Sequence, residues 1–522
     1  MLLVHERRGH RRIAAASASI ALALIALLLF AHRGQAAELI YWDNYGATPQ
    51  TISVANGDGS GGGLLNLTGV QLSDPEGMAI DTVTGRLFVA SANGGPGNTG
   101  EILAANLNGT GASVFSAPGA PVDEPYGVVL DPLTRIIYWA NDGAGDGDNG
   151  SIAWAKLDGS AGGLLNTAGA TVANPYKLGL DPVNGRVYWG NHPKSGPESI
   201  SYANVNNTGG ANLALSRAPE NSYAFAVDPG AGRLYWSEGS LDRFAYTGLL
   251  GGTVSILDTG GAVVNTSYGF AIDPTLNRIS WVNYQNDEDR VNGIGFASLS
   301  GGGGGNLTPS TAPFSGPQDL IVLKSPTATA APAIARNSMS RPALSCSNGT
   351  WATDFAGSYV YQAPTTFAYQ WLRNGAPIAG GTAAALTAQS AGQYLCVVTA
   401  ANQAGSAAVA SAPVKVKAAK FKLTTKKNAK AEAGDLVTFK VKAVNQGDLK
   451  PKSARLCVKL PGPATDDLKA PKCKTLGLKG RAKKTLTLKV KVKPGAEEGT
   501  AKLSFLVKGA AGKTAKSKIV VR

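Results

Sequence analysis

The stretch Asp181-Pro-Val-Asn-Gly-Arg-Val-Tyr-Trp189 recurs along the first 325 residues of the chain. Similar stretches begin at Asp81, Asp131, Asp228 and Asp273, 45 to 50 residues apart. Most copies carry an arginine five residues after the aspartate and a tryptophan eight residues after it. A repeat of this length, built from short apolar runs and turns, is typical of the blades of a β-propeller.

Each repeat predicts four strands. In the third copy, residues 176–181 predict the innermost strand, 186–189 the second, 199–205 the third and 212–215 the short outer one. One such unit cannot bury both faces of its sheet, so we expect the units to stack around a central axis.

The two ends of the repeat region predict how the ring closes. Tyr41-Trp42 forms a second strand with no first strand before it, and residues 317–323 form a first strand with no second strand after it. Together they complete one blade and remove a free sheet edge. Five full copies and this composite blade predict a six-bladed β-propeller.

The Tyr-Trp pairs at residues 41–42, 138–139, 188–189 and 235–236 carry a family resemblance. With their spacing they resemble the class B repeats of the low-density-lipoprotein receptor, the YWTD six-bladed propellers. This resemblance covers residues 39–323 and implies a propeller fold and a tendency to bind proteins. The final aspartate of the family motif is replaced here, by Asn44, Asn141, Asn191, Glu238 and Asn283.

The rest of the chain predicts two β-sandwiches after the propeller of residues 38–325. In residues 326–416, Cys346, Trp371 and Cys396 follow the order of an immunoglobulin-like domain. An unusually long gap separates Cys346 from Trp371. Residues 417–522 alternate lysine with apolar residues, which predicts a second, basic immunoglobulin-like sandwich with half-exposed strands. The whole chain is therefore predicted to be all-β, a six-bladed β-propeller followed by two immunoglobulin-like β-sandwich domains.

The N-terminus and the cysteines predict export. In residues 1–37, four arginines precede an apolar run and a small-residue cleavage site, as in a signal peptide. An uncleaved membrane anchor is the alternative, because the run is about as long as a membrane span. The four cysteines form two local pairs that suit disulfides outside the cell, namely Cys346 with Cys396 and Cys457 with Cys473.

Charge and histidine content narrow the possible functions. Residues 38–413 hold 15 basic and 27 acidic residues, whereas residues 414–522 hold 29 basic and 7 acidic ones. His192 is the only histidine after the leader, which excludes multi-histidine zinc sites and leaves no apparent serine–histidine–aspartate triad. The basic end has no aromatic interleaving, so we expect no nucleic-acid partner. Its lysines are expected to form mainly the solvent face of strands, and attraction to an anionic cell wall or membrane surface is a further hypothesis for this end.

The candidate binding residues lie five positions before each repeated aspartate, where the innermost strands enter the central channel. Tyrosines predominate there, and such residues suit a peptide or a sugar. The alternative is that the tyrosines only cap the core. Lys177, next to Tyr176, and Gln318, the equivalent residue of the composite blade, are included with them. The predicted ligand-binding set is Glu76, Tyr126, Tyr176, Lys177, Tyr223, Tyr268 and Gln318.

A second candidate is a Ca²⁺ site at Asp142, Asp146 and Asp148, where carboxylates alternate with glycines; a solvated turn is the alternative. No other cofactor is expected. The repeated aspartates, by contrast, occur in every full copy, so we interpret them as structural rather than catalytic.

These observations predict a secreted or cell-surface binding or adhesion protein that is not an enzyme. Its propeller would present a face to a protein or carbohydrate ligand, and its sandwiches would serve as spacer and anchor. Two alternatives stay open. One is a propeller enzyme, either a lactonase-like metal hydrolase or a lyase, and the other is a structural component of the cell envelope.

Overall fold

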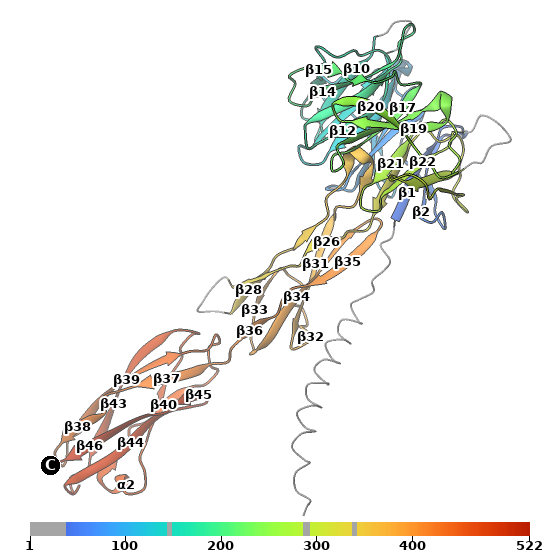
Figure 1. Cartoon of the computed structure of the whole chain (residues 1–522). Coiled ribbons are helices and arrows are strands. Elements are labelled where there is room, and N and C mark those ends of the chain that lie inside the picture. The colour runs from blue at the N-terminus through green and yellow to red at the C-terminus, as the bar shows by residue number, and fades with distance from the viewer. Residues whose placement is uncertain (1–37, 144–148, 285–292, 337–341) are drawn as a thin grey trace, which may run out of the picture.

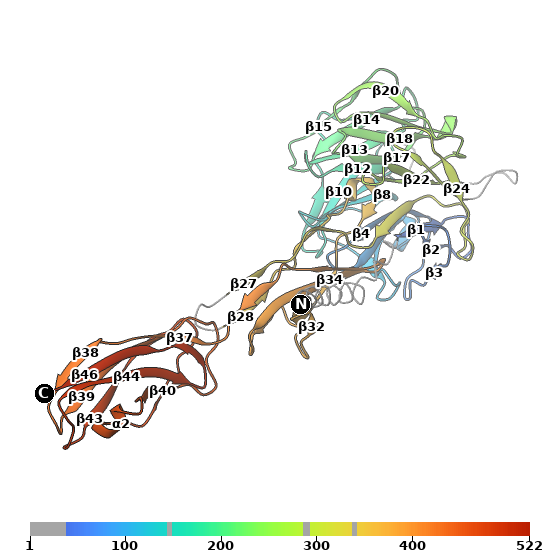
Figure 2. The same cartoon turned by 60° about the horizontal axis from the view of Figure 1, so that its bottom comes forward.

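The computed structural model describes residues 38–143, 149–284, 293–336 and 342–522, which form three parts in a row (Figure 1). The propeller-like part lies at one end of an elongated molecule, and the basic sandwich at the other (Figure 2). Helical structure in these residues is limited to α2 (Ala464–Asp467) and the 3-10 turns η1 (Pro96–Asn98), η2 (Gly239–Leu241) and η3 (Ala356–Ser358). The all-β prediction and the propeller-like first part are confirmed.

Nothing in the described part of the chain is a helix long and apolar enough to cross a membrane. The predicted leader, residues 1–37, lies outside the described residues.

Six sheets make up the first part. Their strands, sheet by sheet, are β1 (Glu38–Asn44), β2 (Thr51–Asn56), β3 (Gly63–Leu65) and β25 (Leu320–Lys324); β4 (Pro75–Asp81), β5 (Arg86–Ser91), β6 (Glu101–Asn106) and β7 (Ser113–Phe115); β8 (Pro125–Asp131), β9 (Ile136–Asn141), β10 (Ser151–Lys156) and β11 (Gly162–Leu164); β12 (Pro175–Asp181), β13 (Arg186–Asn191), β14 (Ser199–Asn204) and β15 (Gly210–Asn212); β16 (Ala214–Leu215), β17 (Ser222–Asp228), β18 (Arg233–Glu238), β19 (Arg243–Gly248) and β20 (Gly251–Leu257); and β21 (Phe270–Asp273), β22 (Arg278–Val282), β23 (Ile294–Ser298) and β24 (Gly305–Leu307).

The innermost strands close into a ring around a central channel. Each of β4, β8, β12, β17 and β21 contacts the next, β21 contacts β25, and β25 contacts β4. As predicted, β1 pairs with β25, with Leu39 opposite Leu323. The first and last strands of this part therefore lie in one sheet.

The repeated stretch is structural, as the sequence indicated. Oδ1 of Asp181 accepts the N–H groups of Val183 and Asn184, both at 3.0 Å, and so fixes the turn after β12. The Arg186 guanidinium lies 4.5 Å from the ring centre of Tyr202. The indole N–H of Trp189 donates to the carbonyl oxygen of Thr171, 18 residues earlier, at 3.0 Å. Trp139 and Trp281 repeat this bond over the same 18-residue offset.

The middle part has three sheets, and its core holds Trp371 and the Cys346–Cys396 disulfide. Its strands are β26 (Ala328–Ala330), β27 (Ile334–Arg336), β28 (Ala343–Cys346), β29 (Thr350–Trp351), β31 (Thr366–Arg373), β32 (Ala376–Pro377), β33 (Ala385–Thr387), β34 (Gly392–Asn402), β35 (Gly405–Ala410) and β36 (Val414–Val416). The hydroxyl of Tyr394, two residues before Cys396, donates to the carbonyl oxygen of Ser390 at 2.7 Å.

The long gap between Cys346 and Trp371 has an unexpected role. Residues 354–362, which include η3 and β30 (Val360–Tyr361), leave the middle sandwich and enter the propeller ring. There β30 pairs in parallel with β25, and η3 contacts β8, β12, β17 and β21. We call this segment the plug. The sequence did not predict it.

The C-terminal part is a second sandwich, and in its core the ring centres of Phe439 and Phe505 lie 5.2 Å apart. Its strands are β37 (Lys420–Thr424), β38 (Asn428–Ala431), β39 (Leu436–Asn445), β40 (Arg455–Lys459), β41 (Leu468–Lys469), β42 (Lys474–Thr475), β43 (Lys483–Val492), β44 (Gly499–Lys508), β45 (Ala511–Lys513) and β46 (Ala515–Val521). Cys457 and Cys473 form the second disulfide, so both predicted pairs are confirmed.

Candidate functional site

The four predicted tyrosines gather at one mouth of the channel, near the starts of the innermost strands. Their rings form a continuous chain: Tyr126 to Tyr176 at 4.3 Å between ring centres, Tyr176 to Tyr223 at 5.4 Å and Tyr223 to Tyr268 at 4.5 Å. All four side chains are partly exposed. Burial raises the pKa of each phenol, so the hydroxyls stay neutral at physiological pH.

Three further aromatic residues extend this ring, and the sequence interpretation missed them. Tyr284 lies 5.2 Å from Tyr268, Tyr45 lies 6.3 Å from Tyr284, and His192 stacks on Tyr223 at 5.3 Å. Each of the three follows a repeated tryptophan by three residues, so the same spacing argument would have found them. We call the seven residues the tyrosine ring: Tyr45, Tyr126, Tyr176, His192, Tyr223, Tyr268 and Tyr284.

The neighbouring loops hold this ring in place. The His192 imidazole contacts Oε1 of Glu198 at 3.0 Å and the carbonyl oxygen of Ser222 at 3.1 Å. Gly239 stands where other copies have a side chain, and a Cβ there would lie 2.4 Å from the Tyr223 ring. The missing side chain gives Tyr223 its space.

The remaining predicted residues, Glu76, Lys177 and Gln318, are buried in the channel. They are joined by two acids that the sequence interpretation did not single out, Asp43 and Asp319. Oδ1 of Asp43 accepts the N–H of Gln318 at 2.6 Å, and Oδ2 of Asp319 accepts the N–H of Met78 at 2.6 Å. We call these five side chains the channel floor: Asp43, Glu76, Lys177, Gln318 and Asp319.

Several polar atoms of the channel floor have no hydrogen-bond partner among the described residues. They are Oδ2 of Asp43, Oε2 of Glu76, Nζ of Lys177 and Oε1 of Gln318. The Lys177 ammonium lies 3.8 Å from Oε2 of Glu76, which is ion-pair distance but too long for a hydrogen bond. Buried polar groups of this kind normally have partners, so the floor has unused capacity for hydrogen bonds.

Burial also changes the protonation of the floor. It raises the pKa of Glu76 to about 8 and that of Asp319 to about 6, and it raises the pKa of Asp43 well above its usual value. The positive charge of the nearby Lys177 offsets part of this rise in the pKa of each of the three carboxyl groups. Near neutral pH the floor therefore contains both neutral carboxyl groups, which can donate, and acceptor oxygens.

The plug closes the opposite end of the channel. The Tyr359 hydroxyl donates to the carbonyl oxygen of Leu178, and the Ser358 hydroxyl to that of Val227. Gly357 packs so tightly that a Cβ would lie 1.7 Å from the carbonyl oxygen of Leu180. The channel is therefore closed at this end, and the tyrosine ring lies at the other mouth.

The Ca²⁺ site at Asp142, Asp146 and Asp148 stays a prediction. Asp142 is partly buried, and burial raises its pKa to about 6. Asp146 and Asp148 lie outside the described residues. In the ranges that the structure describes, no group of three or more His, Cys, Asp or Glu side chains is arranged to hold a metal ion.

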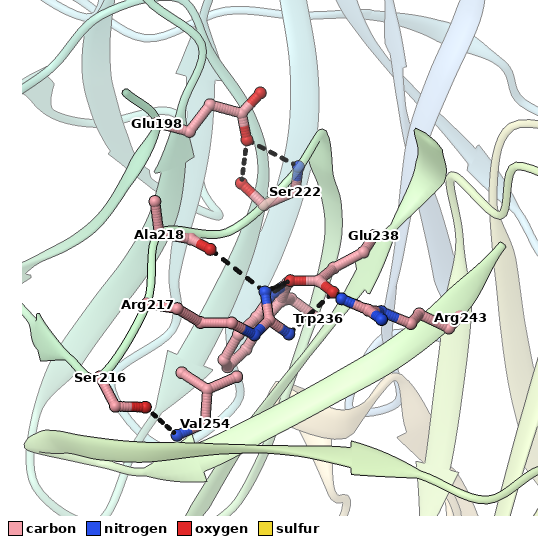
Figure 3. Close-up of polar contacts among 9 residues, drawn as sticks. All are labelled: Glu198, Ser216, Arg217, Ala218, Ser222, Trp236, Glu238, Arg243 and Val254. Atoms are coloured by element: carbon pink, nitrogen blue, oxygen red, sulfur yellow. Dashed lines mark hydrogen bonds and ion pairs between the residues drawn. The ribbon is translucent and has the colours of Figure 1, made fainter. Parts of the chain in front are cut away.

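The sheet that contains β18 differs from the others at one position, where it holds a buried glutamate, a residue type that can serve in catalysis. Glu238 stands where four other copies have asparagine and one has Ser91, and its carboxylate is fully buried. Arg217 binds both of its oxygens, at 2.5 and 2.8 Å, and Arg243 donates to Oε2 at 2.7 Å (Figure 3). Burial raises the pKa of Glu238, but the two arginines outweigh this effect and lower it. Its oxygens are already occupied, so this glutamate is structural.

Comparisons with known proteins give fold-level likenesses alone. No family model matches the chain, and no curated protein matches it. Among solved structures, TolB from Acinetobacter baumannii aligns with a TM-score of 0.40 and 13% identity, over 54% of this chain and 66% of that one. A proposed TolB from Agrobacterium tumefaciens aligns with a TM-score of 0.37 and 12% identity, over 55% and 98%. A proposed 6-phosphogluconolactonase from Bacteroides uniformis aligns with a TM-score of 0.35 and 13% identity, over 55% and 100%. At these values the likenesses carry no functional argument.

Proposed function

We propose that this chain is an extracellular, non-enzymatic binding protein and that the tyrosine ring is its ligand face. The observation that carries the proposal is the continuous chain of partly exposed rings above a buried floor with unpartnered polar atoms. Aromatic faces bind apolar surfaces of sugars and peptides, and their hydroxyls add hydrogen bonds. The two disulfides are consistent with export.

The finer architecture is part of this proposal. We interpret the six sheets as the six blades of a YWTD-type propeller and the two sandwiches as immunoglobulin-like domains. The turn, arginine and tryptophan contacts that repeat from sheet to sheet support the first assignment. The Trp371 packing and the Tyr394 hydrogen bond support the second. The sandwiches would then act as spacer and anchor for the ligand face.

A catalytic function is the second candidate, and one observation favours it. Glu76 has a pKa near 8 and lies next to Lys177 in a buried site, and such perturbed groups are frequent in active sites. The plug, however, closes the far end of the channel, and the tyrosine ring covers the floor. A substrate could reach Glu76 and Lys177 only if the side chains of the tyrosine ring moved aside.

The proposal is tested with the full-length protein, because removal of the middle sandwich would also remove the plug. Labelled protein is applied to arrays of glycans and peptides, and the strongest ligand is titrated in solution. We expect saturable binding that falls at least tenfold in the Tyr126→Ala/Tyr176→Ala variant. Turnover of a small ester that requires a metal ion would contradict the proposal.

A further inference from the structure

The C-terminal sandwich carries basic side chains in ordered rows on both of its outer faces. On the sheet β41-β43-β39-β37-β45 the buried and exposed residues alternate, and the strand register places every exposed lysine except Lys484 on one face. This first face holds nine lysines: Lys420, Lys422, Lys440, Lys442, Lys469, Lys483, Lys489, Lys491 and Lys513.

The opposite sheet, β38-β46-β44-β40-β42, repeats the pattern. Its exposed face holds seven basic residues: Lys430, Arg455, Lys459, Lys502, Lys508, Lys516 and Lys518. No aspartate or glutamate lies on any strand of either sheet. The acidic residues of residues 414–522 all fall in turns and in α2.

The charges on these faces are uncompensated. Some of them lie directly opposite each other across neighbouring strands, as do Lys502 and Lys518, and Lys422 and Lys513. None of the sixteen basic residues forms an ion pair with a carboxylate in the described part of the chain. Like charges directly opposite in a sheet are destabilising, so the rows oppose folding unless a partner neutralises them.

We propose that both faces of this sandwich bind an extended phosphate polymer, so that the domain is embedded in a polyanionic matrix. Lysines two apart on a strand are about 6.6 Å from each other, and neighbouring strands are about 4.8 Å apart. Such a grid suits a flexible chain of closely spaced anions. Lysine binds phosphate as a point charge, without the fixed fork of arginine, so the grid recognises charge density rather than one geometry.

Two observations favour this partner over other polyanions. A flat bilayer can contact only one face of a sandwich, whereas the rows cover both. Binding of single-stranded nucleic acid relies on aromatic side chains that stack its bases, and the three aromatic residues of residues 414–522, Phe421, Phe439 and Phe505, are buried. The preceding 376 residues carry a net charge of −12 and would be repelled, which leaves the propeller outside the matrix.

The experiment uses full-length protein and long-chain inorganic polyphosphate in a titration at several salt concentrations. Two matched variants each remove four charges: Lys440, Lys442, Lys489 and Lys491→Gln on the first face, and Lys502, Lys508, Lys516 and Lys518→Gln on the second. We expect each variant to weaken polyphosphate binding about tenfold and to lower its salt dependence. The variant that combines all eight substitutions should not bind. Thermal unfolding checks the fold, and the variants should unfold at an equal or higher temperature because repulsion is relieved.

Light scattering tests the use of two faces. Wild-type protein should cross-link polyphosphate into large assemblies, and each single-face variant should not. The proposal is overturned if one variant loses all binding while the other binds like wild type, because a single face would then suffice. It is also overturned if vesicles with phosphatidylglycerol, or single-stranded polyadenylate, bind more tightly than polyphosphate at equal charge concentration.

Discussion

The ammonium group of Lys177 lies 3.8 Å from the carboxylate of Glu76, and both side chains are buried beneath the tyrosine ring. This pair lies between the tyrosine ring at one mouth of the channel and the plug of the middle sandwich, which closes the other end. Burial of charge without full hydrogen bonding is costly, and proteins tend to retain it at sites that bind or react.

The buried Glu76 should make stability depend on pH. Its pKa rises on folding from 4.5 to about 8, so between these values the folded state keeps a proton that the unfolded state has released. The free energy of unfolding should therefore fall as pH rises through this range, by up to about 1.4 kcal/mol per pH unit from this group. Glu76→Gln should remove this part of the fall, as measured by urea unfolding at pH 5, 6.5 and 8. Parallel profiles for the two proteins would contradict the buried state of Glu76.

The plug should stabilise the propeller as well as the middle sandwich. Gly357→Ala places a Cβ against the carbonyl oxygen of Leu180, and overpacking of this kind costs roughly 1–3 kcal/mol. Thermal unfolding, followed by near-ultraviolet circular dichroism, should show a lower midpoint. Gly63→Ala is the matched control, since a Cβ there meets nothing within 4 Å. Equal midpoints for both variants would show that the plug does not pack in the channel.

The Glu238 cluster should be structural. Glu238→Gln leaves the buried site without its charge and weakens its bonds to Arg217 and Arg243, so we expect a loss of about 3 kcal/mol in the free energy of unfolding. Ligand affinity should stay within twofold of wild type, because the cluster does not belong to the tyrosine ring. A variant of normal stability that has lost ligand binding would instead make Glu238 part of the site.

The repeated stretch made the propeller-like fold predictable, because its aspartate, arginine and tryptophan make contacts that recur from sheet to sheet. The same logic placed Tyr126, Tyr176, Tyr223 and Tyr268 together. It missed Tyr45, His192 and Tyr284 because the position three after each tryptophan was not compared. Asp43 lies in β1 and Asp319 directly precedes β25, so both lie outside the full copies. The plug could not be predicted, since its partners, such as Leu178 and Val227, lie more than 130 residues away and leave no local pattern.

Ligand binding at the tyrosine ring is the central claim, and a titration of the strongest array ligand tests it most directly. Full-length wild type is compared with Tyr126→Ala/Tyr176→Ala and with Tyr202→Ala, a control tyrosine that packs against Arg186 away from the ring. We predict saturable binding that the ring variant loses by at least tenfold and the control retains. Equal affinity for wild type and the ring variant, both correctly folded, would contradict the account.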